Sequence, residues 1–186
     1  MARYTTFLSS ILFALFLFSC SYELNYETMV RQGLQSGVQQ DSLFLGYHFG
    51  MNIQEFHSSS MEMNRQGKLS GFTKAVYKLE ALKSTASMEF YPTFVDGIIV
   101  RIPVTIGYDS WAPWNEQFSP DELTADLIEY YEDVYNTQFI QIYVPEIGDS
   151  AYVSIEGNRE IRIYQNSLST VMVDFIDLSV YRTSQS

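Results

Sequence analysis

The chain has 186 residues, enough for one domain or two small ones, and 46% of them are hydrophobic. Its 22 acidic residues outnumber its 11 basic ones, and the formal net charge of −11 argues against nucleic acids and anionic lipid headgroups as charge-driven partners. A single cysteine excludes an internal disulfide, so the fold depends on its core, to which 14 tyrosines and 13 phenylalanines bring large rings.

The N-terminal residues have the layout of a secretory signal. Arg3 gives a short positive start, residues 7–18 are almost all apolar, and the polar residues 21–23 follow at once. A membrane-spanning helix needs about 20 apolar residues, and this run is shorter. We therefore expect an export signal and not a transmembrane segment.

The signal ends in Leu17-Phe18-Ser19-Cys20, which resembles the lipobox of bacterial lipoproteins. The resemblance implies that residues 1–19 are a removable signal peptide and that Cys20 is the lipidation site, with acyl chains such as palmitate. Two or more acyl chains give stable anchoring. Ser21, in place of aspartate, implies delivery to the outer membrane, where the domain would face either the periplasm or the cell surface. A cleaved signal with an incidental cysteine is the alternative.

Residues 20–41 are predicted to form a flexible tether between the lipid and the folded domain. They are polar, with glutamines set around Gly33 and Gly37. A flexible coil of this length spans about 25 Å on average. A weak helical turn near Met29 and Val30 is the only ordered structure that this stretch suggests.

The first half of the domain, residues 42–108, is predicted to begin with a short strand over residues 42–50. A helix should follow over residues 53–66, ending before a glycine. Asn52 is placed to cap this helix, and Glu55 three residues later completes a capping box.

Three further strands are predicted over residues 72–82, 88–95 and 98–106, although residues 72–82 could also form a helix, since they have good helix propensity. The last two flank Asp96-Gly97, a strong signal for a two-residue hairpin turn.

That turn predicts which residues of the hairpin lie opposite one another. It pairs Phe94 with Ile99 and Phe90 with Pro103. The second strand then carries a clear core face, but the reverse face still presents Phe90 and Phe94, where a half-exposed sheet should be polar. Either another part of the chain covers these rings, or they form a docking surface for a protein partner.

Residues 108–118 are predicted to form a loop around Trp111-Ala112-Pro113-Trp114. Two interpretations are open. Tyr108, Trp111 and Trp114 could form an aromatic platform for a sugar ring, or the rings could clamp the loop onto the core.

The second half, residues 109–182, is predicted to begin with a second helix. Ser119 is placed to cap it, Pro120 takes the first helical position, and the acidic residues 121 and 122 favour the positive end of the helix dipole. Apolar residues from Leu123 to Tyr135 recur at helical spacing and form one buried stripe.

The remainder of this half is predicted to be all β. Strands are expected over residues 139–144, 151–156, 159–165 and from 171 onward. Apolar residues change parity at Phe175-Ile176, which predicts a β-bulge there. Residues 183–186 should be a frayed tail.

Together these elements predict a single α+β domain over residues 42–182, with an antiparallel sheet packed against two helices in two helix-plus-meander halves. The lipobox and Gly50-Met51-Asn52, leading into the first helix, are similar to the small outer-membrane lipoproteins of the barrel-assembly machinery and to β-lactamase-inhibitor-like domains. The resemblance covers about a tenth of the chain, so the assembly and inhibitory roles of those proteins are not carried over.

Catalytic chemistry finds little support in the sequence. The two histidines have no metal-binding spacing such as HExxH, and there is no phosphate-binding glycine loop. His48, Asp109 and Glu116 are the least unfavourable catalytic candidates. We expect no catalytic site, no metal site and no cofactor.

The sequence therefore predicts a lipid-anchored lipoprotein of the outer membrane that acts as a non-catalytic binding or adaptor domain, with an envelope protein as its partner. The alternative is a glycan-binding module that uses Tyr108, Trp111 and Trp114. A third hypothesis is an enzyme acting on envelope polymers.

Overall fold

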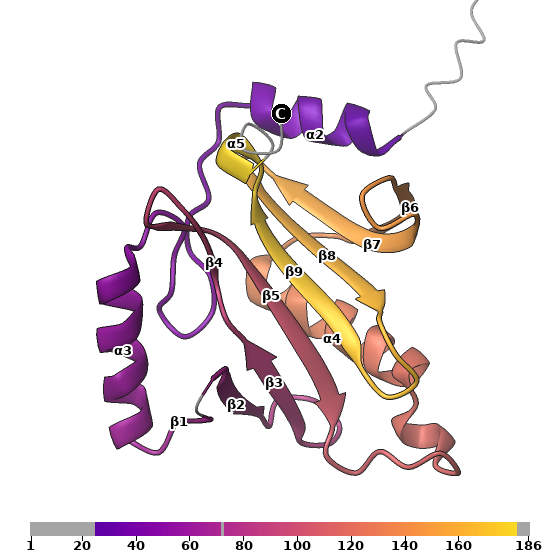
Figure 1. Ribbon diagram of the computed structural model, residues 1–186. Coiled ribbons are helices and arrows are strands. Elements are labelled where there is room, and N and C mark those ends of the chain that lie inside the picture. The colour runs from indigo at the N-terminus through magenta and orange to yellow at the C-terminus, as the bar shows by residue number, and fades with distance from the viewer. Residues whose placement is uncertain (1–24, 72, 182–186) are drawn as a thin grey trace, which may run out of the picture.

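A nine-stranded antiparallel sheet runs through the computed structural model, which describes residues 25–71 and 73–181 (Figure 1). The strands are β1 (Leu69–Ser70), β2 (Ala75–Leu79), β3 (Ala86–Phe90), β4 (Thr93–Val95), β5 (Ile98–Tyr108), β6 (Ile140–Val144), β7 (Asp149–Glu156), β8 (Arg159–Gln165) and β9 (Val171–Asp177). Their spatial order is β1-β2-β3-β5-β9-β8-β7-β6, and β4 also pairs with β5. The predicted α+β class is confirmed.

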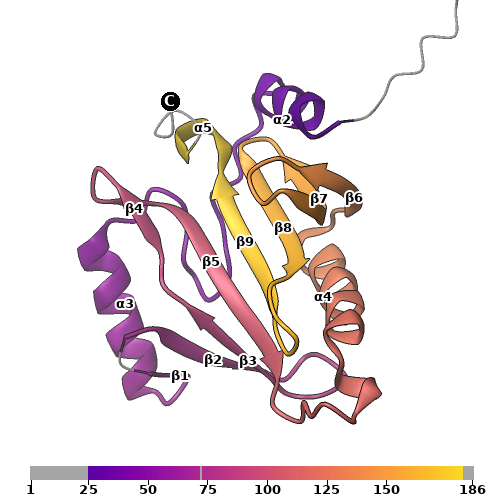
Figure 2. The same cartoon turned by 45° about the vertical axis from the view of Figure 1, so that its right-hand side comes forward.

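Helices lie on both faces of this sheet. They are α2 (Tyr26–Gln35), α3 (Ile53–Arg65), α4 (Pro120–Tyr135) and α5 (Leu178–Tyr181), with a 3₁₀ turn, η2 (Glu116–Phe118), before α4. Residues of α3 and α4 pack into the main core on one face, whereas α2 and α5 contribute to a second, smaller core on the other. Figure 2 shows α4 running beside β8, and α2 at the same end of the sheet as α5.

The two predicted halves join into one sheet. The first half is α3 with β1 to β5, and the second is α4 with β6 to β9. β5 and β9 pair at the junction, where Ile102 lies opposite Phe175 and Val104 opposite Val173. All four side chains are buried in the main core, so the core spans both halves.

Both predicted helix starts are confirmed. The Asn52 side chain accepts hydrogen bonds from the backbone of Gln54 and Glu55, and the Glu55 carboxylate accepts one from the Asn52 backbone, which completes the capping box. The Ser119 side chain caps α4 by accepting a hydrogen bond from the Glu122 backbone, and Pro120 is the first residue of this helix. Local chemistry alone fixes where these helices begin.

The predicted strand over residues 42–50 is wrong. The segment forms a tight loop with a single bridge between Ser42 and His48. Leu45 and Gly46 reverse the chain with φ angles of 55° and 80°. The loop still buries Tyr47 and Phe49, so the apolar pattern reflected core packing and not an extended chain.

The hairpin at Asp96-Gly97 is confirmed, but its register shifts. These two residues have φ angles of 50° and 80°, as a type I′ turn requires, and Phe94 lies opposite Ile99 as predicted. A β-bulge between Thr93 and Phe94 then moves the pairing by one residue, so Phe90 lies opposite Val104 and not Pro103.

This one-residue shift exchanges the faces of β3, because side chains alternate along a strand. Phe90 now points into the main core beside Val104. The reverse face is polar and carries Ser87, Glu89 and Thr105. The predicted apolar reverse face is therefore wrong.

The predicted tether is also wrong over the part that the structure describes. Asn25 caps α2, and Tyr26 and Val30 of this helix are buried in the second core. Beyond the helix, the Gln40 backbone donates a hydrogen bond of 2.7 Å to the Asn158 side chain. The polar stretch is thus folded against the sheet from residue 25 onward.

The docked helix α2 also explains why the predicted bulge at Phe175-Ile176 is absent. β9 keeps an uninterrupted register with β5 and with β8. Phe175 faces the main core, and Ile176 faces the second core with Tyr26. The apolar parity changes because the sheet is buried on both faces at this end. The lipobox and the tail residues 183–186 lie outside the described residues.

Candidate functional site

Of the two interpretations of Phe90 and Phe94, coverage by another part of the chain agrees with the structure, because Phe90 lies in the main core and Phe94 packs against it. Phe90 is only 1% exposed and packs against Phe44 and Tyr47. Phe94 is half-buried and contacts Phe56 and Tyr91 edge-on. Phe90 is a core residue, and Phe94 supports an aromatic cluster beside α3.

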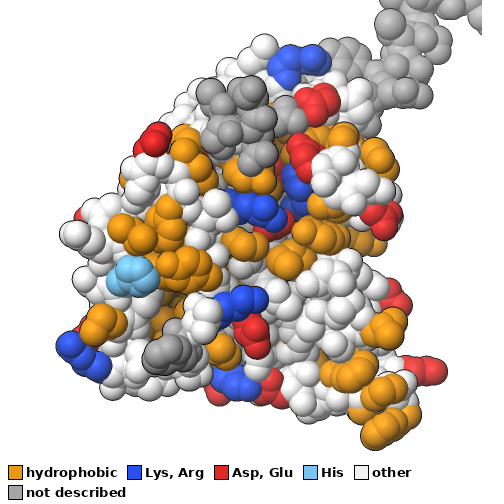
Figure 3. Space-filling model, in the orientation of Figure 1, with side chains coloured by type: hydrophobic (Ala, Val, Ile, Leu, Met, Phe, Trp, Pro, Cys, Tyr) orange, Lys and Arg blue, Asp and Glu red, His pale blue; other side chains and the backbone are white. Residues whose placement is uncertain are grey.

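A cleft of about 400 Å³ lies instead on the polar reverse face, at the end of β5, where the predicted tryptophan loop begins. We call it the Trp111 cleft. Its lining combines one indole ring, two carboxylates and four hydroxyl side chains: Trp111, Asp109, Glu89, Ser87, Thr105, Ser169 and Thr170, together with Gly107 and Tyr108. Figure 3 shows Lys or Arg and Asp or Glu side chains next to one another over this face of the sheet.

The tryptophan loop separates its two indole rings. Trp111 is partly buried, packs against the main core and lines the cleft. Trp114 is 84% exposed and does not line it. Trp111 therefore both lines the cleft and contacts the core, while Trp114 lies outside the cleft, so the two indole rings do not share one platform.

Tyr108 lines the cleft, but its main role is structural and not ligand contact. Its ring is buried and its hydroxyl donates a hydrogen bond to Asp126 of α4. Burial and this hydrogen bond raise the pKa of Tyr108 above its ordinary value. The residue thus ties the end of β5 to α4 and fixes where the tryptophan loop starts.

Asp109 is held in a defined orientation. Lys78 Nζ donates to one carboxylate oxygen at 2.6 Å, and Ser87 Oγ donates to the other at 2.6 Å. Both bonds favour the charged form and hold the pKa of Asp109 below its ordinary value. The ion pair with Lys78 therefore fixes the position of this carboxylate at the cleft and compensates its charge. Glu89, on β3, is exposed.

Two of these lining groups come from a loop distant in sequence. A Cβ atom on Gly107 would lie 3.2 Å from the Ser169 carbonyl oxygen, so the glycine leaves room for the 166–170 loop to close one side of the cleft.

Sequence reasoning found Trp111, Tyr108 and Asp109 but missed Ser87, Glu89 and Thr105, because the bulge exchanged their face with that of Phe90. Nothing local in the sequence indicates Ser169 and Thr170.

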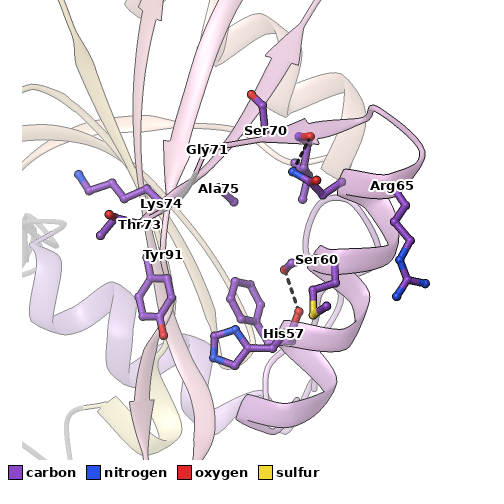
Figure 4. Close-up of a pocket in the computed structure, with 13 residues that line it drawn as sticks. His57, Ser60, Arg65, Ser70, Gly71, Thr73, Lys74, Ala75 and Tyr91 are labelled. Carbon is purple, nitrogen blue, oxygen red and sulfur yellow. Dashed lines mark hydrogen bonds between the residues drawn. The ribbon is translucent and has the colours of Figure 1, made fainter.

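A second cavity, of about 360 Å³, lies between α3 and strands β1 and β2, and we call it the α3 groove (Figure 4). Figure 4 shows the rings of His57 and Tyr91 side by side at one end, while Arg65 and Lys74 extend away from the cavity. Ser60 is already hydrogen-bonded to the Phe56 carbonyl and to Tyr47. Hydrophobic side chains gather beside a histidine over α3 in Figure 3. The lining of this cavity is mixed, with three rings (Phe56, His57 and Tyr91) among polar, charged and aliphatic side chains, and the sequence did not predict the cavity.

The three catalytic candidates are not assembled. Asp109 lines the Trp111 cleft, but His48 and Glu116 do not. His48 Nδ1 lies 2.9 Å from the Phe49 carbonyl oxygen, and Glu116 begins the short turn η2. Within residues 25–71 and 73–181, no three His, Cys, Asp or Glu side chains are grouped as metal ligands would be, and no helix is long and apolar enough to span a membrane.

Comparison with protein-family models, with curated proteins and with solved structures found no match.

Proposed function

We propose that this chain is a lipid-anchored, non-catalytic binding domain of the bacterial envelope, and that it binds carbohydrate in the Trp111 cleft. The observation that carries the proposal is the composition of this cleft, in which one indole ring lies with two carboxylates and four hydroxyl side chains.

This combination suits a sugar ring. A pyranose has an apolar C–H face that packs on an aromatic ring, and a rim of hydroxyl groups that donate and accept hydrogen bonds. Asp109 and Glu89 offer acceptors, and the serine and threonine hydroxyls offer both functions. A cleft of about 400 Å³ is within the usual range for small-ligand sites.

Intrinsic tryptophan fluorescence tests the proposal. Trp114→Phe removes the exposed indole and leaves Trp111 as the single reporter, so this variant should be titrated with a panel of envelope polysaccharides and their oligosaccharides. We expect a saturable change with at least one ligand, and a loss of that change in Trp114→Phe/Glu89→Gln. Glu89 is exposed and at the rim of the cleft, so its change should leave the fold intact. A flat response to the whole panel would contradict carbohydrate binding.

The anchor is proposed from the sequence Leu17 to Cys20. Mass spectrometry of the protein from its native membranes should give an N-terminus at Cys20 with diacylglycerol and a further acyl chain. An N-terminus elsewhere, or an unmodified thiol at this cysteine, would contradict the anchor and the proposed outer-membrane location. It would leave the cleft proposal untouched.

A second candidate retains the adaptor role and moves its surface to the α3 groove. Tyr91 is 40% exposed there, and Met61, which also lines the groove, is 60% exposed, so apolar surface remains available to a protein segment. If a protein partner binds in the α3 groove, Tyr91→Ala/Met61→Ser should bind that partner more weakly than wild type does. Leu168→Ser, at an exposed loop position away from the groove, is the matched control.

A further inference from the structure

The two edges of the sheet differ in how well they are protected against pairing. An edge strand presents unpaired backbone groups, and proteins usually protect it by shortness, charge, proline or a bulge. β1, at one edge, is only two residues long. β6, at the other edge, is Ile140-Gln141-Ile142-Tyr143-Val144, with no charge, no proline and an uninterrupted register with β7.

The outer side of β6 is open in the described part of the chain. There β6 pairs with β7 alone. Ile140 and Tyr143 are 42% and 59% exposed, unusually high for large apolar side chains on a strand. Figure 2 shows β6 at the border of the sheet with no further element beyond it.

The charge pattern indicates what pairs there. In a chain of net charge −11, residues 136–145 carry no charge at all. Antiparallel pairing of β6 with its own copy about Ile142 sets Ile140 opposite Val144 and Gln141 opposite Tyr143. Glu146, the first charge beyond the strand, falls opposite Gln138 of the copy, so no like charges meet. Acidic surface on other parts of the molecule would repel a second copy, whereas the uncharged strand β6 would not.

We propose that β6 pairs antiparallel with β6 of a second copy of this chain, which forms a two-fold symmetric dimer with one continuous sheet. The interface is isologous, because the same strand serves both copies. Backbone hydrogen bonds join the strands, and the apolar alternate side chains specify the register.

Cysteine cross-linking tests the register. In the proposed dimer the two Ile142 Cα atoms are about 4.5–5.5 Å apart, within the range of about 4.4–6.8 Å that a disulfide requires. Ile142→Cys in the full-length membrane-bound protein should form a covalent dimer on mild oxidation. Leu168→Cys, at an exposed loop position, is the control and should not. Equal cross-linking of both variants would overturn the proposal, and so would an Ile142→Cys adduct with a different protein.

A second measurement does not depend on an introduced thiol. Gln141→Lys/Tyr143→Lys places two exposed charges on each edge strand without touching the core. Light scattering of the detergent-solubilised protein should show a dimer dissociation constant at least ten-fold higher than in wild type, with an unchanged melting temperature. Leu168→Lys should behave as wild type. A wild-type chain that is monomeric at every concentration would overturn the proposal.

Discussion

Tyr26 joins the N-terminal helix to the sheet through buried charges. Its hydroxyl donates to Glu160 Oε2 at 2.8 Å and accepts from Arg162 Nη2 at 2.8 Å, and Arg162 Nε donates to the other Glu160 oxygen at 2.7 Å. Burial raises the pKa of Glu160 although Arg162 opposes this shift. A buried ion pair adds little stability by itself. Its role here is to give α2 one position on the sheet.

Removing this hydroxyl should loosen the network. Tyr26→Phe leaves a buried carboxylate and guanidinium without one partner each, so we expect the free energy of unfolding to fall by about 1–3 kcal/mol. Urea denaturation measures the change. Tyr143→Phe, which removes an exposed hydroxyl, should have almost no effect. Equal effects of the two substitutions would contradict a structural role for the Tyr26 hydroxyl.

Asp109 should make stability depend on pH in the acid range. Its pKa in the folded chain lies below the ordinary 3.8, because Lys78 and Ser87 favour the carboxylate. The stabilisation is therefore complete well above pH 3.8 and is lost as pH falls through the lower folded value. Unfolding of wild type and Asp109→Asn should differ most near neutral pH and converge in acid. A difference that does not vary with pH would contradict the assignment.

At the scale of elements, the helix starts were the most predictable features. Asn52, Glu55, Ser119 and Pro120 act within one turn of their own helix, so no distant contact can override them. The hairpin turn was equally local. The bulge after it was not, since it depends on how β4 and β3 share the long strand β5.

The cap of α3 gives a direct check of this local control. Asn52→Ala removes the acceptor for two backbone N–H groups, and we expect a loss of about 1 kcal/mol in the free energy of unfolding. Ser58→Ala, at an exposed position inside the same helix, should be neutral or slightly stabilising. Thermal or urea denaturation distinguishes the two variants, and a neutral Asn52→Ala would contradict the capping box.

The shifted register of β3 predicts the behaviour of the two phenylalanines. Phe90→Ala empties a fully buried site and should cost about 3–5 kcal/mol. Phe94→Ala, at a half-buried site, should cost clearly less. Urea denaturation of both variants tests the register, because the predicted pairing with Pro103 would have placed both rings on the reverse face of the sheet, where the two substitutions should have similar effects.

At the scale of the whole molecule, the prediction went wrong where it assumed that only one face of the sheet is buried. The polar composition of residues 20–41 favoured a tether, yet Asn25 with Tyr26 and Val30 one turn apart suffices for a docked helix. The same helix covers Ile176, whose parity had suggested a bulge. Both errors have one cause, namely a second core that forms only from segments far apart in the chain.

The candidate site shows the same division between local and distant information. Trp111 and Asp109 lie in one loop that the sequence marks, while Glu89 and Thr105 depend on strand register, and Ser169 and Thr170 on the pairing of β5 with β9. The sequence alone identifies the loop that carries Trp111 and Asp109. It does not specify which polar side chains the sheet brings to that loop.

The two indole N–H resonances in a proton–nitrogen NMR spectrum test the central claim most directly, because the chain has only two tryptophans. Trp114→Phe assigns them. On titration with the oligosaccharide that gives the largest fluorescence change, the Trp111 resonance should shift in a saturable way while that of Trp114 stays in place. Binding that moves the Trp114 resonance alone, or moves neither, would contradict carbohydrate recognition in the Trp111 cleft.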